Sequence, residues 1–186
     1  VAFEAHNFDD VEFLWSLPQR VVPLLSRLKG ATRPLPFVED IAVPPEQLHE
    51  FLISAQRVFQ DQETTASLYA HAAAGQLHLR PFLPAPAIDD GARLEQLAAS
   101  LYEEVFRLGG TISGEHGDGL VRSCWNEQVF GSRLYSAFRE VKRAFDPLGL
   151  MNPGKIVDAP MMTENLRFGS QYSAEAVSYT HLTLPT

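Results

Sequence analysis

The chain has 186 residues, of which 45% are hydrophobic and 20% charged, a composition that indicates one globular domain with a sizeable core. Its net charge of -8 argues against a nucleic-acid partner, and no basic run suggests an anionic membrane surface. One cysteine, Cys124, excludes an internal disulfide and a thiolate metal cluster, and no apolar run approaches the length of a transmembrane helix. We therefore expect a cytoplasmic domain, with peripheral attachment to the inner face of a membrane as the alternative.

The two ends suggest a piece of a longer protein. Residue 1 is Val rather than Met, and the last nine residues, 178–186, fit nothing before them and resemble a translated adapter sequence. We expect a domain over residues 1–160, a linker over 161–177 and a non-native tail over 178–186.

The first half of the chain predicts helices around one strand. Residues 9–28 have helical spacing interrupted at Pro18 and Pro23, which favours two short helices over one. Residues 37–43 have a strand pattern closed by two prolines, and a helix is expected to begin at Pro45 or Glu46.

The second half predicts a hairpin and two helices. Strands are expected over 65–72 and 76–82 with the turn at 73–75, and a short strand over 111–113. Asp89 or Asp90 is expected to cap a helix ended by Gly109 and Gly110, and Asn126 to cap a long one stopped at Asp146. The inward positions predicted for this last helix are Val129, Phe130, Leu134, Phe138, Val141 and Phe145. The order of strands and helices predicts an α+β fold, a ferredoxin-like antiparallel sheet with helices on one face.

A glycine-rich stretch, residues 110–119, carries a Glu115-His116 pair. Glycines let a backbone approach a ligand closely, and a carboxylate beside an imidazole suits acid/base work or metal binding. A glycine-rich turn with a solvated Glu-His pair is the alternative.

Two further histidines flank the predicted hairpin turn. His71 and His78 are seven residues apart, so across the hairpin we expect them to be cross-strand partners on one face. With Glu115 they would form a His2Glu metal site with an open position, which leaves His116 free as a base. Two histidines that only pack and hydrogen-bond are the alternative.

Three motifs in order carry a family resemblance: residues 70–78 around the two histidines, 113–119 around Glu115, and 146–155 around Asn-Pro-Gly-Lys. Together they resemble the C-terminal domain of FAD-linked oxidases, a family that includes D-lactate dehydrogenase, D-2-hydroxyglutarate dehydrogenase and the GlcD-type chain of glycolate oxidase. Residues 37–44 and Leu79-Arg80-Pro81 are most similar to the large bacterial members that add an iron-sulfur region.

The resemblance implies roles for individual residues. His71, His78 and Glu115 fall on the divalent metal ligands of the family, usually taken as zinc, and His116 falls on the histidine that removes the hydroxyl proton of the substrate. Residues expected near FAD are Asn152, Gly75 in the turn between the histidines, and Lys155. The implied partners are a small 2-hydroxy acid, an upstream FAD-binding domain and a downstream iron-sulfur region.

Two departures leave the substrate open. Relatives commonly have an arginine at the position of Pro18 and, in the D-2-hydroxyglutarate enzymes, a lysine at the position of Val38. Arg80, Arg122 and Arg20 are then the candidates for holding a substrate carboxylate.

The function that follows is metal-assisted hydride transfer from a 2-hydroxy acid to FAD, with this chain as the substrate-side domain. The alternatives are a metal-dependent hydrolase, because a His2Glu site also activates water, and a non-catalytic ferredoxin-like binding module.

Overall fold

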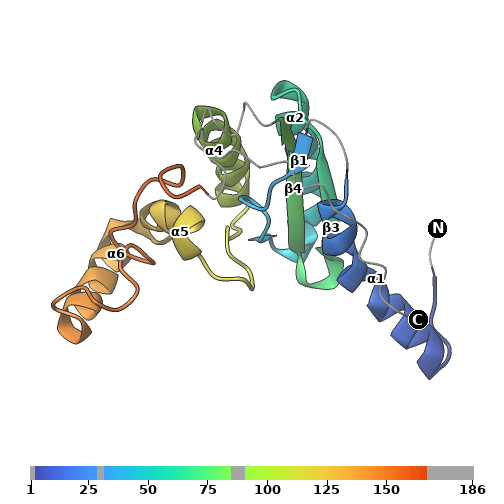
Figure 1. The fold of residues 1–186 in the computed structure, drawn as a ribbon, viewed down its shortest axis with the longest axis horizontal. Helices are drawn as coiled ribbons and strands as arrows, with labels where there is room; N and C mark the ends of the chain where they lie inside the picture. The colour runs from blue at the N-terminus through green and yellow to red at the C-terminus, as the bar shows by residue number, and fades with distance from the viewer. Residues whose placement is uncertain (1–2, 29–31, 85–90, 167–186) are drawn as a thin grey trace, which may run out of the picture.

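The computed structural model describes residues 3–28, 32–84 and 91–166 (Figure 1). The expected helix caps Asp89 and Asp90, the tail over 178–186 and most of the expected linker lie outside these ranges. Among the described residues, no helix has both the length and the apolar character needed to cross a membrane.

A four-stranded antiparallel sheet is built around one long strand, β4 (Gln76–Pro84). Strand β3 (Ala66–His71) pairs with one side of β4, while β1 (Thr32–Pro34) and β2 (Ile41–Ala42) pair in tandem with its other side. Only Ile41 and Ala42 of the predicted strand over 37–43 form a regular strand, β2, and the predicted strand over 111–113 is reduced to a bridge between Thr111 and Ala42. The α+β expectation is confirmed.

Alternation along β4 divides the sheet into two faces. Leu77, Leu79 and Leu83 are buried on one face, and because side chains alternate along a strand, His78 and Arg80 lie on the other. The alternation in the sequence of β4 thus places the core leucines on one face of the sheet and the polar candidate site residues on the other.

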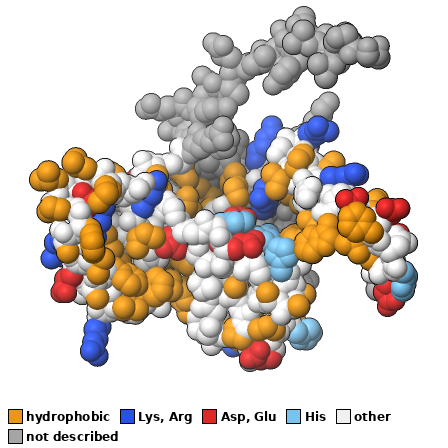
Figure 2. Space-filling model, turned by 90° about the horizontal axis from the view of Figure 1, so that it is seen from below, with side chains coloured by type: hydrophobic (Ala, Val, Ile, Leu, Met, Phe, Trp, Pro, Cys, Tyr) orange, Lys and Arg blue, Asp and Glu red, His pale blue; other side chains and the backbone are white. Residues whose placement is uncertain are grey.

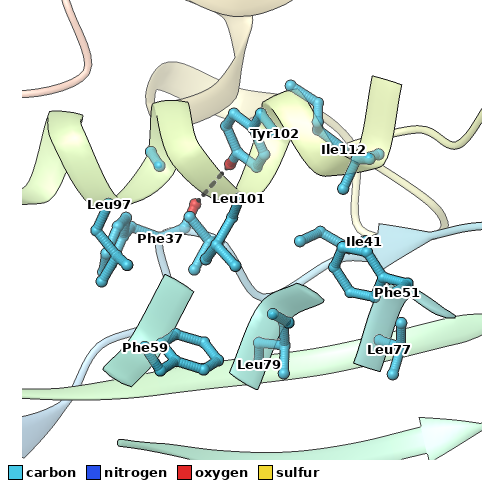
Figure 3. Close-up of a cluster of buried hydrophobic side chains, with 14 of the residues drawn as sticks. Phe37, Ile41, Phe51, Phe59, Leu77, Leu79, Leu97, Leu101, Tyr102 and Ile112 are labelled. Atoms are coloured by element: carbon cyan, nitrogen blue, oxygen red, sulfur yellow. Dashed lines mark hydrogen bonds between the residues drawn. The ribbon is translucent and has the colours of Figure 1, made fainter. Parts of the chain in front are cut away.

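Two helices cover the apolar face of the sheet. Helix α2 (Leu48–Asp61) follows a 3-10 turn, η1 (Pro45–Gln47), and buries Phe51, Ala55 and Phe59 at one-turn spacing. Helix α4 (Gly91–Arg107) packs beside it, and Figure 3 shows its Leu97 and Leu101 directed toward the strands. The Tyr102 hydroxyl donates to the carbonyl of Phe37 at 3.2 Å, and burial raises the pKa of this hydroxyl.

Helix α1 (Phe8–Ser26) is a single helix, so the prediction of two short helices is wrong. Asn7 caps it by accepting from the backbone N–H of Asp10 at 2.9 Å. Each internal proline removes one N–H donor, but α1 has no fully buried residue, so water can reach the carbonyls left without a partner. The cost of each proline is therefore small enough for the helix to continue.

The last helical region lies beside α4, away from the sheet (Figure 1). It consists of α5 (Gly119–Arg122), a 3-10 turn η3 (Ser123–Trp125) and α6 (Asn126–Phe145). Asn126 is not a side-chain cap: its Nδ2 donates to Asp118 and to the carbonyl of Ile156, at 2.9 and 3.0 Å. The predicted inward face of α6 is largely exposed instead, from Phe130 at 42% to Phe145 at 79%.

The segment after α6 returns to the core. Met162 is buried at 2% exposure in the main hydrophobic cluster, and Leu166 packs against the same cluster. The packed part of the chain therefore extends past residue 160, into the stretch expected to be a linker.

Candidate active site

The site lies on the sheet face opposite α2 and α4. His78 and Arg80 project from β4, and their neighbours across the ladder, Tyr69 and Ser67, project from β3 on the same face. Figure 2 shows histidine and acidic side chains gathered in the middle of this side of the molecule, next to the apolar side chains of α1. Alternation along the two hairpin strands therefore places these polar and aromatic side chains on one face of the sheet.

The hairpin register differs from the predicted one by two residues. His78 is paired with Tyr69, and His71 with Gln76, so the two histidines are diagonal rather than direct partners. The chain turns one residue earlier than predicted, through η2 (Ala72–Ala74), and Gly75 adopts φ 68°. A shift of two keeps each side chain on its face, and the two imidazole centroids lie 5.4 Å apart.

The glycine-rich stretch is folded around the carboxylate of Asp40, which has 0% exposure. This carboxylate accepts from the backbone N–H groups of His116 at 2.8 Å and Glu115 at 3.1 Å, and from the side chain of Gln76 at 2.6 Å. Gly114 fits here because a Cβ would lie 1.8 Å from the Gln76 side-chain oxygen. Asp40 thus fixes the backbone from which Glu115 and His116 project.

The imidazole of His116 is oriented by a second acidic residue. Its Nδ1 lies 2.6 Å from Oε1 of the buried Glu39. An ionised carboxylate only accepts hydrogen bonds, so this contact favours a proton on Nδ1 and a free lone pair on Nε2. The ring also stacks on His78, with centroids 5.1 Å apart.

Glu115 joins the three histidines. Its Oε1 lies 3.0 Å from Nε2 of His78, 3.9 Å from Nε2 of His71 and 3.5 Å from Nε2 of His116. Ligand atoms around a tetrahedral zinc are about 3.3 Å apart, so the spacing between Glu115 and His78 fits a small divalent cation, whereas His71 lies farther from the carboxylate. One oxygen facing three imidazole nitrogens is an arrangement that a cation would stabilise.

A second donor set overlaps the first. Asp40, His78, Glu115 and His116 each offer a ligand atom, and these atoms lie within 4.8 Å of one another. The oxygens of Asp40 already accept several hydrogen bonds, whereas the imidazole of His71 makes no hydrogen bond to any other described residue and lies 3.9 Å from Glu115. His78 and Glu115 are common to both sets and are therefore the centre of the candidate metal site.

A cavity of about 220 Å³ opens next to His78 and His116. Its lining residues are Pro18, Val21, Val22, Leu25, Glu39, Ser67, Tyr69, His78, Arg80 and His116. The volume suits a small organic acid, and the cavity places such a molecule between the sheet and α1.

The candidate arginines Arg80 and Arg122 have different surroundings. Arg80 lines the cavity, with Nη2 3.8 Å from Oε2 of Glu39. Arg122 is buried, donates from Nη2 to the carbonyl of Gly117, and has Nη1 3.8 Å from Oε1 of Glu39. Arg122 is thus held by the carbonyl of Gly117 and by Glu39, and Arg80 is the arginine that lines the cavity.

The residues expected near FAD lie in two places. Gly75 is buried, and a Cβ there would lie 1.9 Å from the carbonyl oxygen of Val43, so packing alone explains the glycine. Asn152 and Lys155 lie in the exposed segment after α6, and the Lys155 amine donates to the Asn152 side chain at 3.3 Å. A lysine ammonium and an asparagine amide on an exposed turn are groups that can hydrogen-bond to the polar atoms of a cofactor.

Sequence reasoning missed Glu39 and Asp40, which organise the site. The signal was present: two adjacent carboxylates interrupt an apolar strand pattern between Val38 and Ile41. Carboxylates are seldom buried without partners, so such a pair predicts polar contacts that must come from elsewhere in the chain.

Comparison with known families matches residues 2–156 to the family described as FAD linked oxidases, C-terminal domain. The chain belongs to this family.

Relatives with assigned names come from several bacteria and an archaeon. The chain is 37% identical over 152 residues to the D-2-hydroxyglutarate dehydrogenase of Pseudomonas putida, a match to 82% of this chain and 15% of the relative. It is 30% identical over 171 residues to glycolate oxidase subunit GlcD of Escherichia coli, covering 92% of this chain and 32% of the relative. It is 31% identical over 122 residues to the D-lactate dehydrogenase of Archaeoglobus fulgidus, covering 64% of this chain and 26% of the relative. The chain thus spans about a seventh to a third of the length of these relatives.

Proposed function

We propose that this chain is the substrate-side domain of an FAD-dependent 2-hydroxy acid dehydrogenase of the D-lactate, glycolate or D-2-hydroxyglutarate type. The observation that carries the proposal is the convergence of His78, Glu115 and His116 beside a cavity that Arg80 also lines, in a chain of this family. FAD, when bound, accepts the hydrogen and two electrons that leave the substrate α-carbon as its hydroxyl becomes a carbonyl.

His116 is the proposed base. Its Nε2 has a free lone pair when Nδ1 donates to Glu39, and it lies at the cavity, where a substrate hydroxyl can donate to it. Glu39 then stabilises the imidazolium that forms, since its carboxylate remains 2.6 Å from the Nδ1 proton donor. In this proposal Nε2 of His116 accepts the hydroxyl proton of the substrate, and Glu39 fixes the orientation of the imidazole ring.

The proposed metal ligands are His71, His78 and Glu115, with zinc as the proposed ion. A divalent cation bound there would lower the pKa of a coordinated hydroxyl and bind the neighbouring carboxylate. Only His78 belongs to both the metal set and the cavity lining, so it is the residue that would bring the two together.

Arg80 is the proposed anchor for the substrate carboxylate. It lies on the same face of β4 as His78, one side-chain repeat further along the strand. Arg122 remains a second candidate, but its contacts with Gly117 and Glu39 favour a role in holding the loop that carries His116.

We propose that an FAD-binding domain precedes this domain in the same protein, that an iron-sulfur region follows it, and that Asn152, Lys155 and Gly75 approach the flavin. Exposed apolar side chains on α1 and α6, such as Trp15 at 63% and Phe145 at 79%, support a covering partner domain. By itself the chain is expected to bind FAD poorly and to lack activity.

Flavin absorbance tests the proposal. The protein that includes the upstream region should purify yellow with a bound divalent metal, and D-2-hydroxy acids added without oxygen should bleach the flavin. Metal without flavin would favour a hydrolase, and the absence of both would favour a binding module. Either result would contradict the proposed function.

A further inference from the structure

The candidate cavity has two chemically different walls. The sheet-side wall contributes His78, Arg80 and His116, together with Ser67 and Tyr69. The opposite wall is supplied by α1 and consists of Pro18, Val21, Val22 and Leu25. A substrate between these walls would have its carboxylate next to Arg80 and its remaining carbon atoms next to the apolar side chains of α1.

Helix geometry determines which side of α1 faces the sheet. Leu14, Pro18, Val21 and Leu25 are half-buried at spacings of four, three and four residues, whereas most other positions of α1 are exposed. This spacing places the four on one side of the helix, and three of them line the cavity. The apolar wall is therefore a continuous helix face.

Charge is distributed unequally between the walls. Arg80 is the cation among the lining residues, and Glu39 is the acidic one. The basic residues of α1, Arg20 and the C-cap Arg27, are exposed and do not line the cavity. A carboxylate bound to Arg80 is paired, whereas a second carboxylate against α1 would face apolar carbon and lack a cation.

We infer that the substrate is a 2-hydroxy monocarboxylic acid with an apolar side chain, and that α1 selects against a second carboxylate. The carboxylate pairs with Arg80, the hydroxyl lies at His116, and the side chain packs on Val21, Val22 and Leu25. The inference rests on the proposed function and narrows its substrate class. It sets this chain apart from relatives whose names specify 2-hydroxyglutarate, a dicarboxylate, with which it shares about a third of the aligned residues.

Substrate competition tests the inference on the protein that includes the upstream FAD-binding region. We expect kcat/KM for D-2-hydroxybutyrate and D-2-hydroxyisovalerate to exceed that for D-2-hydroxyglutarate by about tenfold or more, since a second carboxylate loses part of its hydration against the apolar side chains of α1 and gains no cation there. Equal or higher kcat/KM for D-2-hydroxyglutarate would overturn the inference and leave the proposed function standing. If none of the three acids, nor D-lactate or glycolate, reduces the flavin, both are overturned.

A charge placed on the apolar wall provides the second test. Val22→Arg, at a cavity-lining position that is 45% exposed, should raise the kcat/KM ratio of D-2-hydroxyglutarate to D-2-hydroxybutyrate by about tenfold. Leu24→Arg is the matched control, because Leu24 is 60% exposed and does not line the cavity. An unchanged ratio in Val22→Arg with normal flavin content, or an equal change in the control, would overturn the role of α1.

Discussion

Helices α4 and α6 have similar apolar spacing in the sequence, but they lie in different environments in the structure. Helix α4 buries six residues against the sheet and α2, whereas α6 buries only Asn126 and Tyr135. The difference comes from the surroundings: α4 has a sheet face beneath it, and the apolar side of α6 has little to pack against among the described residues. An apolar stripe predicts that a helix has a buried side in the complete protein, and it does not say which element covers it.

The largest expected effect compares one side chain from each helix. Leu101→Ala in α4 removes a residue of 0% exposure and should lower the free energy of unfolding by about 3 kcal/mol or more. Val141→Ala in α6, at 59% exposure, should change it by less than about 0.5 kcal/mol. Urea denaturation of the chain measures both, and similar losses would show that α6 is packed as tightly as α4.

The next effect concerns the loop that joins α4 to the last helices and carries Glu115 and His116. Asp40→Ala leaves the donors at Gln76, Glu115 and His116 without their acceptor and should cost about 2 kcal/mol of unfolding free energy. Asp61→Ala makes the same chemical change at an exposed position and serves as the control. If the two variants were equally stable, Asp40 would not be what holds the site loop.

The smallest effect is a dependence on pH at the end of α6. Asp146 accepts from Lys142 at 2.6 Å and from the backbone N–H groups of Leu150 and Met151, and these contacts lower its pKa to about 2. Because the pKa in the unfolded chain is about 3.9, this stabilisation is present above about pH 4 and is lost as the pH falls toward about 2. Asp146→Asn should therefore destabilise the chain at about pH 6 and have less effect near about pH 3, as followed by circular dichroism. A loss of the same size at both pH values would contradict this account.

The sequence was sufficient for the β3–β4 hairpin and for much of the site because both depend on alternation. The pattern of β4 separates Leu77 and Leu79 from His78 and Arg80, and an error of two residues in the hairpin register does not alter the face. By the same logic, His71 and His78 could be placed together although their predicted pairing was wrong.

What sequence reasoning missed depends on contacts between distant segments. Asp40 and Glu39 bind a loop more than 70 residues away, and no local pattern identifies that partner. The single helix α1 was also mispredicted, because the cost of Pro18 and Pro23 depends on how exposed the surrounding helix is. The position of α1 over the cavity also depends on how the helix packs against the sheet, which the sequence does not show.

The most direct test of the account is the rate at which a 2-hydroxy acid reduces the flavin in His116→Ala. In the protein that includes the FAD-binding region, stopped-flow absorbance should show normal flavin content and reduction slower by about a hundredfold or more, as expected for loss of a general base. Reduction at the unaltered rate, with flavin content unchanged, would contradict the assignment of His116 and with it the central claim about this site.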